Sequence, residues 1–160
     1  MVSGRRTTIV ACATGKVRAG VSIIRVSGPD AFRITEALTQ KPSSPPRRVV
    51  NRNFLGANKQ LIDKGLVVFF QGPASFTGED LVEYHTHGSP FIVEELIKQA
   101  IDLGCELAKP GEFSERAFLH GKVDLVQAEA ICDLIQSQTQ KQAQAAAASL
   151  QGVFSDRVKR

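Results

Sequence analysis

The sequence has no tryptophan, a single tyrosine, and three cysteines that form no C-x-x-C pair. Cys12, Cys105 and Cys132 lie far apart and are odd in number, so neither a disulfide framework nor a zinc site is indicated. We interpret them as small buried hydrophobic residues. No stretch approaches the roughly 18 consecutive apolar residues of a membrane-spanning helix, and the first residues, MVSGRRTT, lack the apolar core of a secretory signal. A cytoplasmic protein without a membrane partner is therefore expected.

A phosphate-binding loop of the type G-x-x-x-x-G-K-[ST] is also missing. The nearest text, TGKVRAG at residues 14–20, has its lysine too early and no Ser or Thr after it. We therefore expect that this chain does not hydrolyse GTP by the P-loop route.

The net charge of +4 is small, and the two ends of the chain account for it. Residues 1–6 carry +2 and residues 155–160 carry +2, so the residues between them sum to zero. RNA-binding domains usually show a clustered basic face. Any contact with RNA is therefore expected to need surface outside this chain.

Short apolar runs alternate with helical patterns over the first hundred residues, and we expect an α/β (α+β) domain with a mixed sheet and packed helices. The expected strands are residues 8–13, 21–27, 49–55, 65–71, 80–87 and 105–108. The expected helices are residues 29–38 and 90–103. Ser27 is placed to cap the first helix, and Gly104 is placed to end the second.

From Pro110 onward the pattern is wholly helical. We expect a short helix at residues 111–119, a longer one that Asp124 and Gln127 begin with a capping box, and a further helix within residues 139–160. The apolar stripe of the longer helix needs a partner surface, either the next helix or a second copy of the chain. That stripe consists of Leu125, Ala128, Ile131, Cys132 and Ile135.

Three charged residues stand out by their positions. Glu83 shares a strand face with Leu81, so its carboxylate needs a hydrogen-bond donor to offset desolvation. Arg25 interrupts the apolar run VSIIRV, and a salt bridge between Arg25 and Glu83 would satisfy both side chains. Lys122 follows Gly121, where a solvated turn residue is the ordinary interpretation.

Two further groups have simple explanations. Glu112 and Arg116 are four residues apart on a helix, which is typical of a surface ion pair, although they could instead shape a pocket wall. His85 and His87 share a strand face, but two histidines without a third ligand do not indicate a metal site. We expect no metal.

Two dense motifs, GPASFTGEDLVEYHTHGSP at residues 72–90 and GEFSERAFLHGKVDLVQAEAICDLI at residues 111–135, closely resemble the N-terminal region of the bacterial tRNA-modification GTPases called MnmE or TrmE. A third match combines TIVACAT at residues 8–14 with GVSIIRVSGPDA at residues 20–31. The resemblance implies a tetrahydrofolate-binding and dimerisation domain at residues 1–119, similar in fold to folate-binding aminomethyltransferase domains. It also implies that residues 120–160 begin an incomplete, all-α central domain.

The same resemblance implies that Arg25, Glu83 and Lys122 bind 5-formyltetrahydrofolate. They match the motifs R-[IV]-S-G, F-T-G-E-D-x-x-E and A-F-x-x-x-K-x-D-L. A carboxylate such as Glu83 can accept two adjacent N–H donors from the aminopyrimidinone edge of a reduced pterin. One departure is the loop at residues 15–20, which lacks the Pro-Pro-Gly found in many members and so loses their restriction of φ.

For the whole protein, the family implies a homodimer that works with an FAD-dependent partner on the wobble uridine of certain tRNAs and installs an aminomethyl-type group. GTP, Mg²⁺ and K⁺ would belong to a G domain, and no catalytic residue is expected in this chain. Two alternatives stay open: a free-standing folate-dependent one-carbon transferase, and an interaction module in which Arg25 and Glu83 form only a structural pair.

Overall fold

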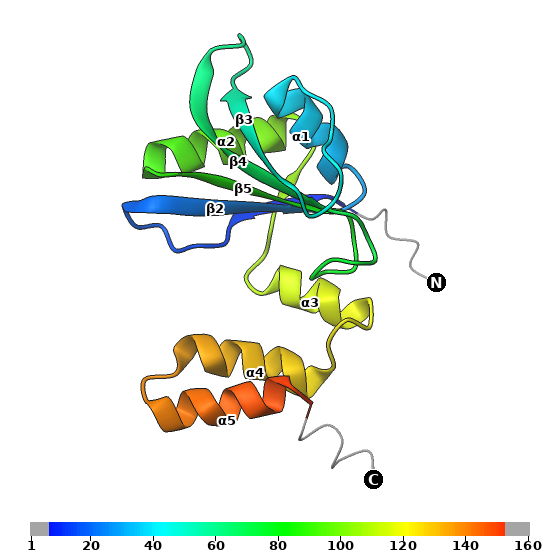
Figure 1. Cartoon of the computed structure of the whole chain (residues 1–160), viewed down its shortest axis with the longest axis vertical. Helices are drawn as coiled ribbons and strands as arrows, with labels where there is room; N and C mark the ends of the chain where they lie inside the picture. The colour runs from blue at the N-terminus through cyan, green and yellow to red at the C-terminus, as the bar shows by residue number, and fades with distance from the viewer. Residues whose placement is uncertain (1–6, 153–160) are drawn as a thin grey trace. The chain divides into compact units, whose positions relative to one another are not determined.

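The computed structural model describes residues 7–152, and these divide into two compact units between Pro110 and Gly111. The functional boundary expected after residue 119 stays a prediction. The first unit is α/β (Figure 1). Its elements are β1 (Ile9–Cys12), β2 (Ala19–Ser27), α1 (Ala31–Thr39), β3 (Val49–Leu55), β4 (Leu61–Phe70), β5 (Leu81–Gly88), α2 (Pro90–Asp102) and β6 (Glu106–Leu107).

The sheet of the first unit has six strands in the order β3-β4-β5-β2-β1-β6. All neighbouring strands are antiparallel except β1 and β6, which are parallel, so the expected mixed sheet is confirmed. Helices α1 and α2 lie on one face of this sheet (Figure 1). The strand β3 forms one edge, and β5 lies in the interior between β4 and β2.

The core lies between the sheet and these two helices. Alternate residues of β2 and β5 point into it, including Ile24, Val26, Val82 and Tyr84, all fully buried. The Tyr84 hydroxyl hydrogen-bonds Thr35 Oγ1 of α1 at 2.6 Å, and burial raises the pKa of this phenol above its usual value. The opposite face of β2 and β5 therefore carries the intervening residues, among them the candidate site residues.

Ser27 does not cap α1, contrary to the expectation from sequence. The helix begins after Asp30, which makes no side-chain cap, and the backbone N–H of Asp30 donates to Thr8 Oγ1 at 2.9 Å. Ser27 Oγ instead donates to Glu79 Oε2 at 2.8 Å. A hydroxyl at a strand end thus bonds a loop that is distant in sequence, which local pattern cannot reveal.

The second unit contains α3 (Glu112–Leu119), α4 (Leu125–Gln136) and α5 (Gln140–Leu150) among its described residues. The capping box of Asp124 and Gln127 is confirmed. Within the single chain the predicted stripe of α4 is not the face that packs on α5, because Leu125 and Ile135 are 60% and 79% exposed, and its packing on a second copy stays a prediction. Helices α4 and α5 instead pack on each other with small alanines buried, one in each helix. The part of the last predicted helix beyond residue 152 lies outside the described residues.

The three cysteines differ in environment, so their interpretation as buried residues is only partly right. Cys105 is buried, Cys12 is half-buried, and Cys132 is exposed on α4. Burial raises the pKa of the Cys105 thiol to about 12. Among residues 7–152, no helix has the length and apolar character to cross a membrane.

Candidate functional site

The candidate site begins with a direct cross-strand pair on the sheet face opposite α1 and α2. Arg25 of β2 and Glu83 of β5 are opposite each other in the antiparallel register. Side chains directly opposite in such a pair point to the same face. The sequence indicates both residue types, but only the register shows that they meet.

The Arg25 guanidinium binds Glu83 through one oxygen. Its Nη2 and Nε donate to Oε1 at 2.9 Å and 3.2 Å, and the two side chains are 26% and 19% exposed. The other oxygen, Oε2, has His85 Nε2 at 3.4 Å as its only hydrogen-bond partner among the described residues. Since a carboxylate oxygen has two acceptor positions, Oε2 retains capacity for a further N–H donor.

An aromatic side chain covers the arginine. The guanidinium carbon of Arg25 lies 5.6 Å from the centroid of the Phe76 ring, within cation–π range. Phe76 belongs to the loop between β4 and β5 and is 37% exposed. The site therefore combines a carboxylate, a guanidinium and a partly exposed ring.

Buried polar side chains hold this loop in place. Ser27 Oγ bonds Thr77 Oγ1 at 2.7 Å and donates to Glu79 Oε2, and Ser75 Oγ donates to the Glu79 carbonyl. Thr77 is fully buried and Glu79 is 9% exposed. The sequence analysis missed these positioning residues. Several polar residues in a loop bounded by Gly and Pro could have indicated a loop held by its own hydrogen bonds.

The two histidines of β5, His85 and His87, contact different carboxylates. His85 contacts Glu83, whereas His87 Nδ1 lies 2.8 Å from Asp63 Oδ1 and its backbone N–H donates to Asp63 Oδ2 at 2.9 Å. Among residues 7–152, no three His, Cys, Asp or Glu side chains are grouped so that they could hold a metal ion.

Lys122 belongs to the second compact unit, in the turn between α3 and α4, and it is exposed. Its backbone N–H donates to the Ala117 carbonyl at 2.8 Å, next to Gly121 at φ +69°. In the same unit Arg116 Nη2 lies 3.7 Å from Glu112 Oε2, the spacing of an i,i+4 pair. A shared site of Lys122 with Arg25 and Glu83 stays a prediction.

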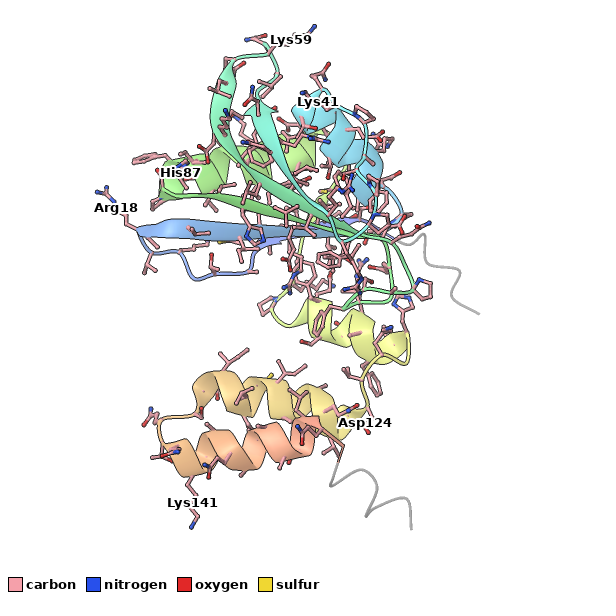
Figure 2. The ribbon with its side chains drawn as sticks, in the orientation of Figure 1. Arg18, Lys41, Lys59, His87, Asp124 and Lys141 are labelled. Carbon is pink, nitrogen blue, oxygen red and sulfur yellow. The ribbon has the colours of Figure 1, made fainter. Side chains whose placement is uncertain are left out.

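The loop that lacks Pro-Pro-Gly borders a hollow away from this pair. A cavity of about 470 Å³ is lined by Arg18, Gly20, His87 and Phe91, among others, and neither Arg25 nor Glu83 lines it. Figure 2 shows Arg18 and His87 near the end of the sheet where β2 begins and β5 ends. The Arg25–Glu83 pair therefore lies outside both this loop and the cavity that the loop borders.

The chemistry of the pair fits a reduced folate. Glu83 Oε2 has an acceptor position suited to an N–H of a pterin edge, and the Arg25 guanidinium beside it adds positive charge to the site. One detail differs from the expectation: Oε1 already accepts two N–H groups of Arg25. Acceptance of two pterin donors, one on each oxygen, therefore requires Arg25 to release one of its bonds.

Comparison with known proteins identifies relatives over nearly the whole chain. The tRNA modification GTPase MnmE of Legionella pneumophila (strain Corby) is 50% identical over 151 residues, which are 94% of this chain and 34% of that protein. The tRNA modification GTPases MnmE of Pseudomonas fluorescens (strain Pf0-1) and Methylococcus capsulatus (strain Bath) are each 48% identical, over 98% and 97% of this chain and 34% of their own length.

The chain thus spans about a third of the length of these relatives. Residues 8–122 also match a family model described as GTP-binding protein TrmE N-terminus. Since this match covers well over half of the chain and agrees with the motifs at residues 72–90 and 111–135, the chain belongs to the TrmE N-terminus family.

Proposed function

We propose that this chain is the folate-binding and dimer-forming N-terminal part of a tRNA-modifying GTPase, followed by the start of its helical domain. The observation that carries the proposal is the partly exposed Arg25–Glu83 pair, in which Glu83 Oε2 keeps acceptor capacity. Both residues occupy the positions at which the family motifs place folate contacts. The fold that we propose for the domain is similar to that of folate-binding aminomethyltransferases.

Each residue has a distinct task in this proposal. Glu83 accepts N–H groups of the pterin edge, and Arg25 orients the Glu83 carboxylate and attracts the acidic or carbonyl groups of the folate. Lys122 supplies a second cation. The bound folate supplies the one-carbon unit for the modification. Residues of the loop 71–80 keep Phe76 over Arg25 and so help to position the guanidinium.

For the whole protein we propose a cytoplasmic homodimer that acts with an FAD-dependent partner on the wobble uridine of certain tRNAs. GTP hydrolysis, with Mg²⁺ and K⁺, is assigned to a G domain outside these 160 residues. Residues 1–119 are proposed as the folate and dimer domain, and residues 120–160 as the start of an all-α central domain. The name of the relatives, tRNA modification GTPase, supports this assignment.

Calorimetric titration with 5-formyltetrahydrofolate tests the proposal. Removal of a buried charged partner in a binding site costs about 2–5 kcal/mol, so Glu83→Ala is expected to weaken binding by roughly 30-fold or more. Glu94→Ala is the matched control, because Glu94 is an exposed carboxylate on α2. Equal affinity of Glu83→Ala and the control would refute the assigned role of Glu83. A folded, dimeric parent that binds no folate would indicate an interaction module instead.

One observation favours a second candidate, a free-standing folate-dependent one-carbon transferase. Such an enzyme needs a group that can transfer protons beside the carbon unit, and His85 lies 3.4 Å from Glu83 Oε2. Measurable one-carbon transfer by the chain alone, lost in His85→Gln with folate binding retained, would establish this candidate. Binding of folate without transfer would leave the first proposal standing.

A further inference from the structure

The residues between the two basic ends of the chain sum to zero charge, but their positive and negative side chains are concentrated in different segments of the sequence. Residues 40–64 contain six Lys or Arg and a single acidic residue, a net charge of +5. Residues 65–152 contain twelve acidic and five basic residues, a net charge of −7. The six basic residues, here called the basic edge, are Lys41, Arg47, Arg48, Arg52, Lys59 and Lys64.

The basic edge surrounds the outer strand of the sheet. Strand β3 is the sheet's edge strand, and the basic edge covers the loop before β3, β3 itself, the turn to β4 and the start of β4. Arg52 Nη2 donates to the Pro42 carbonyl at 3.3 Å, which ties β3 to the residue that follows Lys41. Figure 2 shows Lys59 at the tip of the β3–β4 hairpin and Lys41 at the end of α1. The charges therefore gather on one side of the first unit.

The neighbouring acidic groups are already engaged. Asp63, the single acidic residue within residues 40–64, is 8% exposed and accepts two hydrogen bonds from His87 when Nδ1 carries the proton. Glu36 of α1 accepts the backbone N–H and the hydroxyl of Ser43 through one oxygen, at 2.8 Å and 2.7 Å. By contrast, five of the six basic residues are exposed, and only Arg52 is half-buried. The positive charge is thus presented to solvent with little local compensation.

Charges on an edge strand often serve only to prevent pairing with another sheet. That explanation does not suit this distribution, because only Arg52 and Lys64 lie on the strands themselves. The Arg52 guanidinium is turned back onto the carbonyls of Asn51 and Pro42. Four of the six basic residues are in the loop and the turn that flank β3, where they do not protect the strand edge.

We propose that the basic edge binds the phosphate backbone of RNA. Lys and Arg that neutralise phosphates release counterions, which supplies most of the affinity of such contacts without any sequence specificity. Phe54, the single aromatic residue within residues 40–64, is fully buried. The nearby Phe70 ring already carries the Arg47 guanidinium, whose carbon lies 5.3 Å from the ring centroid, so the proposal does not include base stacking. The choice of RNA among polyanions rests on the proposed function, in which a tRNA is the substrate. This assignment replaces the sequence-based expectation that RNA would need surface outside the chain.

Binding of a labelled bulk tRNA to the 160-residue chain, measured by fluorescence anisotropy over about 50–200 mM salt, tests this proposal. The variant combines Lys41→Gln, Arg48→Gln and Lys59→Gln, exposed residues whose side chains make no hydrogen bond or ion pair within residues 7–152. The matched control combines Lys98→Gln, Lys109→Gln and Lys141→Gln, which removes the same charge from exposed positions outside the basic edge.

We expect the first variant to bind tRNA roughly tenfold or more weakly. The slope of the logarithm of the binding constant against the logarithm of the salt concentration should fall in magnitude by about 2 to 3, since each lost phosphate contact lowers it by about 1. The control is expected to stay close to the parent. Folate titration of the first variant is expected to match the parent, so a failure here is distinct from a failure of the folate site. Equal losses in both variants, absence of tRNA binding by the folded parent, or preferential binding to phosphatidylglycerol vesicles would overturn the proposal.

Discussion

Arg25 and Glu83 are directly opposite on β2 and β5, and two nitrogens of the Arg25 guanidinium, Nε and Nη2, donate to the same carboxylate oxygen of Glu83. A fork-to-fork pair would instead use both oxygens. The one-sided geometry leaves Oε2 with a single hydrogen-bond partner among the described residues, His85 Nε2 at 3.4 Å. The pair is therefore a salt bridge in which Glu83 Oε2 keeps one acceptor position, the position that the proposed function assigns to a ligand.

This arrangement separates stability from ligand binding in a testable way. Replacement of a partly buried ion pair by apolar residues of similar size is often neutral or stabilising. We therefore expect Arg25→Met with Glu83→Leu to change the free energy of unfolding by less than about 1 kcal/mol, and to abolish folate binding. Urea denaturation and calorimetric titration measure the two effects. A loss of several kcal/mol in the double variant would show that the pair is needed for the fold itself.

The loop that carries Phe76 gives a second prediction. Thr77→Val keeps the shape of a fully buried side chain but removes the hydroxyl that bonds Ser27 Oγ at 2.7 Å. Loss of a buried hydrogen-bond partner costs about 1–3 kcal/mol, which urea denaturation can measure. Folate affinity should fall as well, because Phe76 lies over Arg25.

Thr77→Ser provides the matched control, since it keeps the hydroxyl and loses one methyl group, at a cost of about 1 kcal/mol. We expect the serine variant to retain folate affinity close to the parent. If valine were tolerated as well as serine in both assays, the buried hydroxyl would have no positioning role.

The local sequence pattern predicted secondary structure correctly where neighbouring residues in the chain determine it. The strand at residues 49–55 and the helix start at Asp124 were predicted from sequence and are confirmed as β3 and α4. Ser27 failed as a predicted cap because its partners, Thr77 and Glu79, are about fifty residues away. The Ser27 hydroxyl donates to the Glu79 carboxylate instead of capping the nearby helix α1.

For the candidate site, too, the sequence predicted the residue types but not which residues lie next to each other in the fold. The carboxylate on β5 was predicted from alternation, yet the register that pairs Glu83 with Arg25 depends on how β2 and β5 are aligned. In α4, periodicity selected Leu125 and Ile135, whereas the contact with α5 uses small residues that allow close approach of the helices. Net charge likewise concealed the basic edge, because a sum over the chain discards position.

The cysteines should differ sharply in reactivity. The thiolate is the reactive form, and the pKa of the buried Cys105 thiol is raised to about 12, so this residue stays protonated at neutral pH. Cys132 is exposed on α4. We expect a maleimide at neutral pH to label Cys132 rapidly and Cys105 only after unfolding, as mass spectrometry of peptides would show. Rapid labelling of Cys105 in the folded Cys132→Ser variant would contradict the burial.

The hydrogen bonds of Glu36 lead to a pH-dependent prediction. The Ser43 hydroxyl and, secondly, the Ser43 backbone N–H lower the pKa of this carboxyl below 4.5 against an opposing effect of burial. Because the folded-state pKa is lowered, the stabilisation is present above about pH 4.5 and is lost as the pH falls through the folded-state pKa. Ser43→Ala removes the hydroxyl, the donor that lowers the pKa of Glu36 most, so it should destabilise the protein by about 1 kcal/mol at neutral pH.

That difference should shrink in acid, because protonated Glu36 no longer accepts a charge-assisted bond from Ser43 in the parent. Urea denaturation of parent and Ser43→Ala at neutral pH and near pH 3 measures the change. In a Glu36→Gln background, which cannot titrate at this position, the effect of Ser43→Ala should not vary with pH. A constant difference between parent and Ser43→Ala across the pH range would mean that Ser43 supports the loop after α1 through contacts other than the Glu36 carboxylate.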